Sequence, residues 1–389
     1  MQSRKPTMLF LSWRDIKSPN MGGAEIFTHE MMRNSDLSKF EYVHFSPMYK
    51  GAQSSETIDG IIYIREGNLL TVIFKCIKYY KRNKDIIAFV VDQCNTFRFF
   101  TKFWVSSKKR IFLIFQLSRE IWAYHMRFPF NKIGKWLETP MLKLNKNDPT
   151  ITISESTKKD LQNVGFDESK VKIIPVGMPF APWSRQDFCE KEPDPTFIYV
   201  GRFAKYKGID ACVYAYGEYK KKNSNAKLWI VGKKDNIYIN SVLQPVCTLY
   251  GLSCGDVGSN ADIIFHGFVA EEKKLELMSR AHLLLVPSIR EGWGLIVTEA
   301  AAVGTPGIVY KSPGLVDAVD NGKAGFIVEQ NNYRELLVAM ESVFIDTMRY
   351  ELIRENAHNF SQRFSWKRTG EEFNNFLDGM LSKQHGRVL

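Results

Sequence analysis

The chain has 389 residues, of which 44% are apolar and 24% charged, a composition that fits about two globular domains and excludes a disordered, collagenous or low-complexity chain. Lys and Arg outnumber Asp and Glu by 53 to 42, and the resulting net charge of +11 favours an anionic partner, although solubility alone also explains it. We expect a cytoplasmic chain with reduced thiols, since the six cysteines are scattered and no apolar run approaches the roughly 18 residues of a membrane span.

Short β-branched or aromatic runs alternate with amphipathic stretches along most of the chain. In the first half, strands are expected at 8–13, 42–46, 61–64, 86–91, 111–116, 150–154 and 171–175, and helices at 24–34, 69–81 and 155–163. In the second half, strands are expected at 196–201, 227–232, 262–265, 283–286, 307–309 and 325–328. This alternation predicts βαβ units with parallel sheets, so both halves should be α/β.

Proline marks the boundary between the two halves. Five of the 15 prolines fall within residues 175–195, and proline cannot donate a hydrogen bond to a sheet. We therefore expect a semi-rigid linker between a domain at 1–178 and a domain at 179–364. Residues 366–380 have the apolar spacing of an amphipathic helix. Ligands of open α/β sheets bind beyond the carboxyl ends of the strands, so the functional motifs should follow strands.

Two motifs that follow strands could hold an anion. Gly22 and Gly23 come after the first strand and open a helix, whose N-terminus presents free N–H groups; a flexible loop is an equally good interpretation. Arg202 and Lys207 follow the strand at 196–201 and suit a diphosphate, because arginine offers a planar fork and lysine a mobile point charge. The plainer interpretation is two solvated surface cations.

The segment 287–306 is the most informative part of the sequence. A buried strand leads into a loop in which Gly292 and Gly294 expose the backbone, and an alanine-rich helix follows. Glu291 lies in this loop and Glu299 eight residues further on, and either carboxylate can accept hydrogen bonds from vicinal hydroxyls. In a purely structural interpretation, Glu299 would complement the helix dipole and Trp293 would be a core aromatic residue, but the clustering of the loop, the glycines and two carboxylates at a strand end argues against it.

Together these motifs resemble the family 4 retaining glycosyltransferases, which are nucleotide-sugar enzymes of the GT-B fold. The resemblance covers nearly the whole chain and is most specific in Glu291-x7-Glu299 and in the stretch from Gly201 to Gly208. It implies two Rossmann-like domains that face each other across a cleft. The N-terminal domain would be the acceptor side, residues 179–364 would bind the nucleotide sugar, and the terminal helix within 365–389 would cross back to the N-terminal domain.

The resemblance also implies a role for each motif. Glu299 would bind the ribose hydroxyls, Arg202 and Lys207 the diphosphate, and Glu291 would lie beside the donor sugar. Backbone N–H groups for the sugar or the phosphate would come from Gly292, Trp293, Gly294 and Leu295. Gly22 and Gly23 would close on the phosphate from the other domain.

One position departs from the pattern of the family. Relatives often have a histidine where this chain has Phe115, and phenylalanine cannot donate a hydrogen bond to a sugar hydroxyl. Gln116 and Arg119 are the candidates to replace it.

The implied reaction is front-face transfer of a hexose-type sugar, with retention, from a UDP- or GDP-sugar to a glycan or lipid-linked acceptor. The chain has no Asp-x-Asp motif, so we expect neither a metal nor a cofactor beyond the donor. The alternative is an inactive transferase that binds a sugar nucleotide or glycan. Residues 104–110 and 122–146 mix aromatics with cations and suit an anionic membrane surface. For residues 122–146, a packed acceptor-side subdomain is an equally good interpretation. We expect no nucleic-acid partner, since the basic runs at 78–82 and 220–222 are short and suit solvated helix faces.

Overall fold

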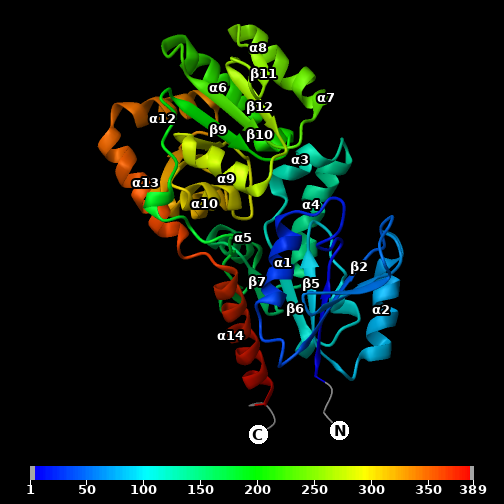
Figure 1. The fold of residues 1–389 in the computed structure, drawn as a ribbon. Coiled ribbons are helices and arrows are strands. Elements are labelled where there is room, and N and C mark those ends of the chain that lie inside the picture. The colour runs from blue at the N-terminus through cyan, green and yellow to red at the C-terminus, as the bar shows by residue number, and fades with distance from the viewer. Residues whose placement is uncertain (1–4, 386–389) are drawn as a thin grey trace. The chain divides into compact units, whose positions relative to one another are not determined.

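The computed structural model describes residues 5–385 and divides the chain into two compact units (Figure 1). The first unit comprises Met1–Arg119, Lys132–Pro179 and Phe364–Leu389, and the second comprises Glu120–Asn131 and Phe180–Arg363. The expected boundaries differ from this division chiefly at Glu120–Asn131, which was expected in the N-terminal domain. Its first residue is held by the second unit, because the Nε atom of Arg290 donates to a carboxylate oxygen of Glu120 at 2.7 Å.

The first unit is built on an eight-stranded sheet with the order β3-β4-β2-β1-β5-β6-β7-β8. All neighbouring strands are parallel except β3 and β4. Its strands are β1 (Thr7–Leu11), β2 (Glu41–Ser46), β3 (Ser55–Ile58), β4 (Ile61–Arg65), β5 (Ile87–Cys94), β6 (Arg110–Ile114), β7 (Thr150–Thr152) and β8 (Val171–Ile173). Its helices include α1 (Gly23–Arg33), α2 (Val72–Asn83), α4 (Phe130–Lys143), α5 (Glu155–Val164) and α14 (Trp366–His385). Strand β1 is buried along its whole length, as expected for a parallel strand in the middle of a sheet.

The hairpin of β3 and β4 was not foreseen. Asp59 and Gly60 connect the two strands with φ angles of 48° and 81°. An Asp-Gly pair favours this two-residue turn, because both of its residues need a positive φ. The strand itself escaped notice because Ser55–Ile58 is short and mostly polar, and it pairs only at the edge of the sheet.

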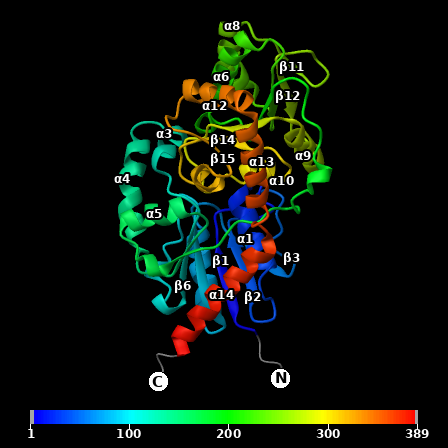
Figure 2. The same ribbon diagram turned by 90° about the vertical axis from the view of Figure 1, so that its left-hand side faces the viewer.

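The last helix, α14, packs on the first unit although it follows the second unit in the sequence, and Figure 2 shows it beside α1. Phe373 is fully buried, and its ring lies 6.0 Å from that of Phe10 in β1. The side chain of Asn374 accepts a hydrogen bond from the backbone of Asp36 at 3.0 Å. The apolar stripe read from the sequence is thus the face that α14 buries, and the return of the helix to the N-terminal unit is confirmed.

The second unit is built on a seven-stranded parallel sheet with the order β11-β12-β10-β9-β13-β14-β15. Its strands are β9 (Thr196–Val200), β10 (Lys227–Val231), β11 (Cys254–Asp256), β12 (Ile263–Gly267), β13 (Leu283–Val286), β14 (Gly307–Tyr310) and β15 (Gly325–Val328). Its helices include α3 (Trp122–His125), α6 (Ile209–Lys222), α7 (Asn236–Tyr238), α8 (Gln244–Tyr250), α9 (Glu271–Arg280), α10 (Leu295–Ala302), α11 (Leu315–Ala318), α12 (Tyr333–Ile345) and α13 (Thr347–Ser361). Of the helices in residues 5–385, none is long and apolar enough to cross a membrane.

The proline-rich segment does not run free between the units after Pro179. Lys191 buries its ammonium group in the second unit, where it donates to the backbone oxygens of Ser279 at 2.9 Å, Ala281 at 2.7 Å and Gly304 at 3.1 Å. Ser279 lies in the last turn of α9 and Ala281 directly follows it, so the lysine also meets the negative end of that helix dipole. The expected linker is therefore fastened to the second unit along its C-terminal half.

Candidate functional site

The loops that follow β9 and β13 meet at the carboxyl edge of the second sheet. The backbone N–H of Ile289 donates to the carbonyl oxygen of Tyr206 at 3.0 Å and ties one loop to the other. Gly208 permits this approach, because it has a φ of 72° and a Cβ atom there would lie 2.4 Å from the carbonyl oxygen of Pro287. The structure therefore brings the Arg202–Lys207 motif and the Glu291 loop together, as expected for motifs that follow strands of one parallel sheet.

Lys207 and Glu291 form an ion pair across these two loops. Both side chains are largely buried, with exposed fractions of 19% and 16%. The sequence assigned Lys207 to a diphosphate and Glu291 to a sugar, and the structure shows that without a ligand each group satisfies the other. A ligand that engages either group must therefore compete with this ion pair.

Arg202 is the more accessible of the two cations. Its side chain is exposed, and its Nη2 atom donates to the hydroxyl of Tyr206 at 3.2 Å. The hydroxyl of Tyr199 in β9 donates to the Arg202 carbonyl oxygen at 3.0 Å and holds the backbone at this point. Arg202 is thus an exposed guanidinium on a fixed backbone, which suits the binding of an anion.

The loop from Gly292 to Leu295 leads into α10, where Gly294 is the N-cap residue with a φ of 97°. Trp293 is only 9% exposed, and its indole N–H donates to the hydroxyl of Thr298 at 2.9 Å. The indole is therefore turned inward, and only the backbone of Trp293 remains to serve a ligand. The burial of this indole agrees with a core position, against which the sequence analysis argued.

A glycine that the sequence analysis overlooked supports the same loop. The backbone N–H of Glu291 donates to the carbonyl oxygen of Pro313 at 3.3 Å. At Gly314, where φ is 78°, a Cβ atom would lie 2.3 Å from the carbonyl oxygen of Glu291. The only signal in the sequence is the Pro-Gly pair of a turn, which does not show where the turn packs.

Glu299 lies in α10 and is paired with a lysine from the preceding helix. The Nζ atom of Lys274 lies 2.6 Å from the Oε2 atom of Glu299, and the exposed fractions of the two side chains are 16% and 11%. Burial raises the pKa of Glu299, and the positive charge of Lys274 opposes that rise. The partner was not foreseen, because nothing in the spacing of Lys274 sets it apart from the other charged residues of α9.

Gly22 and Gly23 belong to the first unit and begin α1. Gly22 is the N-cap residue, and its backbone N–H donates to the Oε2 atom of the buried Glu25 at 2.7 Å. The Oε1 atom of Glu25 accepts from Arg14 and from Asn95, both at 3.1 Å. The N–H of Gly22 thus binds a carboxylate of the chain itself, with which a phosphate would have to compete, while Gly23 is exposed.

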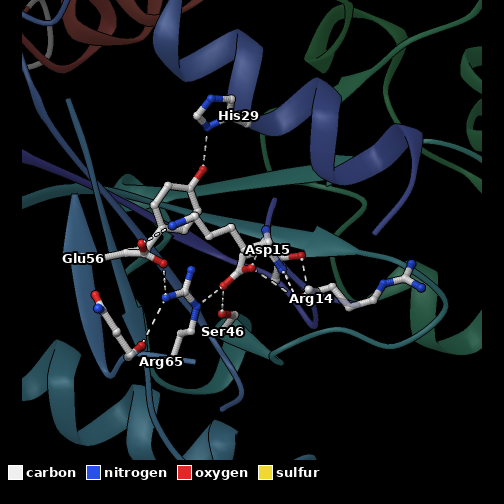
Figure 3. Close-up of polar contacts among 11 residues, drawn as sticks. Arg14, Asp15, His29, Ser46, Glu56 and Arg65 are labelled. Atoms are coloured by element: carbon white, nitrogen blue, oxygen red, sulfur yellow. Dashed lines mark hydrogen bonds and ion pairs between the residues drawn. The ribbon is translucent and has the colours of Figure 1, made fainter. Parts of the chain in front are cut away.

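The sequence analysis did not foresee a buried polar cluster near the carboxyl ends of β1 and β4 (Figure 3). Arg65, the last residue of β4, is fully buried and forms ion pairs with Asp15 and Glu56. Asp15 also accepts from the hydroxyl of Ser46 at 3.1 Å. Burial raises the pKa of Asp15, but its hydrogen bond with Arg65 and the nearby charges outweigh that effect and lower it. The cluster fixes the loop between β1 and α1, and the only sequence signal was an arginine at the end of an apolar strand.

Phe115, the position where relatives often have histidine, is buried and contributes to the core of the first unit. Its ring packs edge-on against that of Phe27, with centroids 5.4 Å apart. Arg119 is tied down, since it donates to the hydroxyl of Thr139 at 2.8 Å. The Oε1 atom of Gln116 is buried without a hydrogen-bond partner among the described residues. Of the two candidates to replace the histidine, Gln116 therefore offers a buried polar atom without a partner in the described part of the chain, whereas Arg119 already uses one guanidinium nitrogen on Thr139.

The match to a known family falls on the second unit. Residues 183–360 match the sequence model of the family described as glycosyl transferases group 1. An uncharacterized glycosyltransferase of Methanocaldococcus jannaschii is 26% identical over 237 residues, which cover 57% of this chain and 57% of that protein. The chain thus matches little more than half the length of this curated relative.

Solved structures match over both units. The sucrose-phosphate synthase of Thermosynechococcus elongatus is 18% identical, with a TM-score of 0.74 over 99% of this chain and 100% of its own. Anabaena HepE in complex with UDP and glucose is 15% identical, with a TM-score of 0.65 over 96% of this chain and 99% of its own. The chain therefore has the GT-B fold, and residues 183–360 resemble the glycosyl transferases of group 1.

Proposed function

We propose that this protein is a retaining glycosyltransferase of family 4. It transfers a hexose-type sugar from a UDP- or GDP-sugar to a glycan or lipid-linked acceptor, and it needs no metal ion. The observation that carries the proposal is the meeting of Lys207, Glu291 and the N-terminal end of α10 at the carboxyl edge of one parallel sheet. This edge is where open α/β sheets bind ligands, and it lies inside the region that matches the glycosyl transferases of group 1.

In the proposed reaction the acceptor hydroxyl attacks the anomeric carbon from the side on which the diphosphate leaves. The bond between that carbon and the diphosphate oxygen breaks, and the departing oxygen takes the proton of the acceptor hydroxyl. Negative charge grows on the diphosphate as the bond breaks. Lys207 and Arg202 would stabilise this charge where it is greatest, in the transition state, and stabilisation there raises the rate.

The ion pair of Lys207 with Glu291 predicts how these two residues respond to mutation. Lys207→Met should lower kcat and weaken nucleotide binding together, because the lysine would act on a group whose charge increases during the reaction. Glu291→Gln should leave nucleoside diphosphate binding equal or tighter, since Lys207 is then released, while turnover falls. Lys205→Met is the matched control, because Lys205 lies in the same turn and is exposed. Unchanged turnover in the Lys207 and Glu291 variants would refute the assigned roles.

A binding protein with a degenerate active site is the alternative, and Phe115 favours it. The buried ring cannot supply the hydrogen bond that the histidine of relatives would offer. A thermal-shift panel of nucleotide sugars, followed by assays for release of the nucleoside diphosphate, separates the two functions. Stabilisation by a nucleotide sugar without release in the presence of any glycan or lipid-linked acceptor would identify a binding protein.

The proposed acceptor side includes a surface that suits contact with an anionic membrane. In α4 of the first unit, Trp136 is 73% exposed and Ile133 is 46% exposed, with the exposed Lys132 and Lys135 beside them. Aromatic and basic side chains on one amphipathic helix are typical of a helix that lies on a bilayer surface. Cosedimentation with vesicles of phosphatidylglycerol, compared with phosphatidylcholine, tests this contact.

A further inference from the structure

The side chain of Glu299 is held from one direction only. Its Oε2 atom lies 2.6 Å from the Nζ atom of Lys274, whereas its Oε1 atom forms no hydrogen bond with any described residue. Lys274 is itself anchored, because its Nζ atom lies 2.7 Å from the Oε1 atom of Glu271 one turn earlier in α9. One carboxylate oxygen is therefore fixed by a restrained lysine, and the other is free to meet a ligand.

The charge of Glu299 depends on this lysine. Burial raises the pKa of the carboxyl group, and Lys274 is the group that opposes the effect of burial. Among the described residues, the charges that act on Glu299 come from α9 alone, with Lys274 lowering its pKa and Glu271 raising it. Only the ionised carboxylate accepts hydrogen bonds at both of its oxygens, as a pair of vicinal hydroxyls requires.

We propose that Lys274 is a positioning residue of the nucleotide site, which holds Glu299 as an oriented anion that accepts the ribose hydroxyls of a nucleoside diphosphate. This inference rests on the proposed function, since it assumes that the site binds a nucleotide. Lys274 does not touch the ribose and acts through Glu299. It fixes the direction of the carboxylate by one short hydrogen bond, and its positive charge opposes the rise that burial causes in the pKa of Glu299.

The test measures binding of UDP, GDP and inorganic pyrophosphate to the full chain by calorimetry. At pH 7, Lys274→Met should weaken binding of the nucleotide that the parent chain prefers by about tenfold or more, which corresponds to about 1.4 kcal/mol. Binding should recover as the pH rises, because an unpaired buried carboxyl group still ionises at higher pH. Pyrophosphate has no ribose, so its binding should not change.

Three further variants serve as controls for the loss of the Lys274 charge. Lys273→Met removes the neighbouring positive charge, whose partner is Glu276 on the surface of α9, and should bind nucleotide as the parent does at every pH. Lys274→Arg keeps a cation beside Glu299 and should restore most of the affinity. If the methionine variant does not fold, Lys274→Gln keeps a polar tip in the same place without the charge and should show the same pH-dependent loss.

The outcomes separate the two proposals. If the parent chain binds neither UDP nor GDP, the proposed function is wrong and the role of Lys274 is refuted with it. If the parent binds a nucleotide but Lys274→Met retains its affinity and its pH profile, only the role of Lys274 is refuted. Equal weakening of nucleotide and pyrophosphate would also refute it, because it would show that the lysine acts on the phosphate.

Discussion

Replacing Gly208 by alanine tests whether the contact between the two loops makes the site. Gly208 has a φ of 72°, and a Cβ atom would lie 2.4 Å from the carbonyl oxygen of Pro287, which is backbone and cannot rotate away. The left-handed conformation costs a non-glycine residue about 1 kcal/mol or more, and forced overpacking adds about 1–3 kcal/mol. We therefore expect Gly208→Ala to lower the free energy of unfolding by about 2–4 kcal/mol.

Gly251 provides the matched control for this substitution. Its φ is 64°, nearly the same, but no atom lies within 4 Å of its Cβ position. Gly251→Ala should therefore show the conformational cost alone, about 1 kcal/mol, and the difference between the two variants measures the displacement of the loop.

Urea unfolding and calorimetric binding of UDP or GDP together decide the outcome. The displaced loop carries Lys207 and contacts the loop of Glu291, so Gly208→Ala should also weaken nucleotide binding by about tenfold or more, while Gly251→Ala should not. Equal losses of stability in the two variants, together with unchanged nucleotide affinity in Gly208→Ala, would show that the contact with Pro287 does not shape the site.

Three further predictions concern pH, packing and metal. Burial lowers the pKa of His44 from the ordinary 6.5 to about 4, so the unfolded chain binds the proton more tightly than the folded chain does. The free energy of unfolding should therefore fall by up to about 3 kcal/mol as the pH drops from 6.5 to 4. Urea unfolding across this range should show a smaller decrease for His44→Gln, and an equal decrease would contradict the prediction. Phe373→Ala in α14 should lower the free energy of unfolding by about 3–5 kcal/mol, and hydrogen-exchange protection should be lost in β1 and α1. A loss of protection confined to the second unit would contradict the packing of α14. Sugar transfer should survive EDTA, and strict dependence on added Mg²⁺ or Mn²⁺ would refute the metal-free reaction.

The sequence was sufficient for the class of fold and for most of its strands. Thirteen runs of β-branched or aromatic residues were expected to be strands, and each overlaps a strand of the structure. The pattern is reliable here because a parallel strand covered on both faces is apolar along its length. The two strands that were missed, β3 and β11, lie at sheet edges and carry polar residues or glycine, so they lack this signal.

Only the tertiary structure decided which side chains meet. Lys207 pairs with Glu291 84 residues later, and Lys274 with Glu299 25 residues later. Local periodicity reports which face of an element is apolar, whereas these pairs depend on the order of the strands and on backbone approaches such as that of Gly208 to Pro287. The burial of Arg65 had no local signal beyond the position of an arginine at the end of an apolar strand, for the same reason.

The glycines and carboxylates of the proposed nucleotide site show which features the sequence determined and which depended on the tertiary structure. The sequence alone placed Gly294 before α10 and Glu299 within it, because a strand, a glycine loop and an alanine-rich run follow one another in the chain. It argued against a core position for the indole of Trp293, which the structure shows to be buried, and it did not reveal that Glu25 occupies the N–H of Gly22. Such choices depend on which hydrogen-bond partner lies within about 3 Å, and that distance is set by the packing of distant segments.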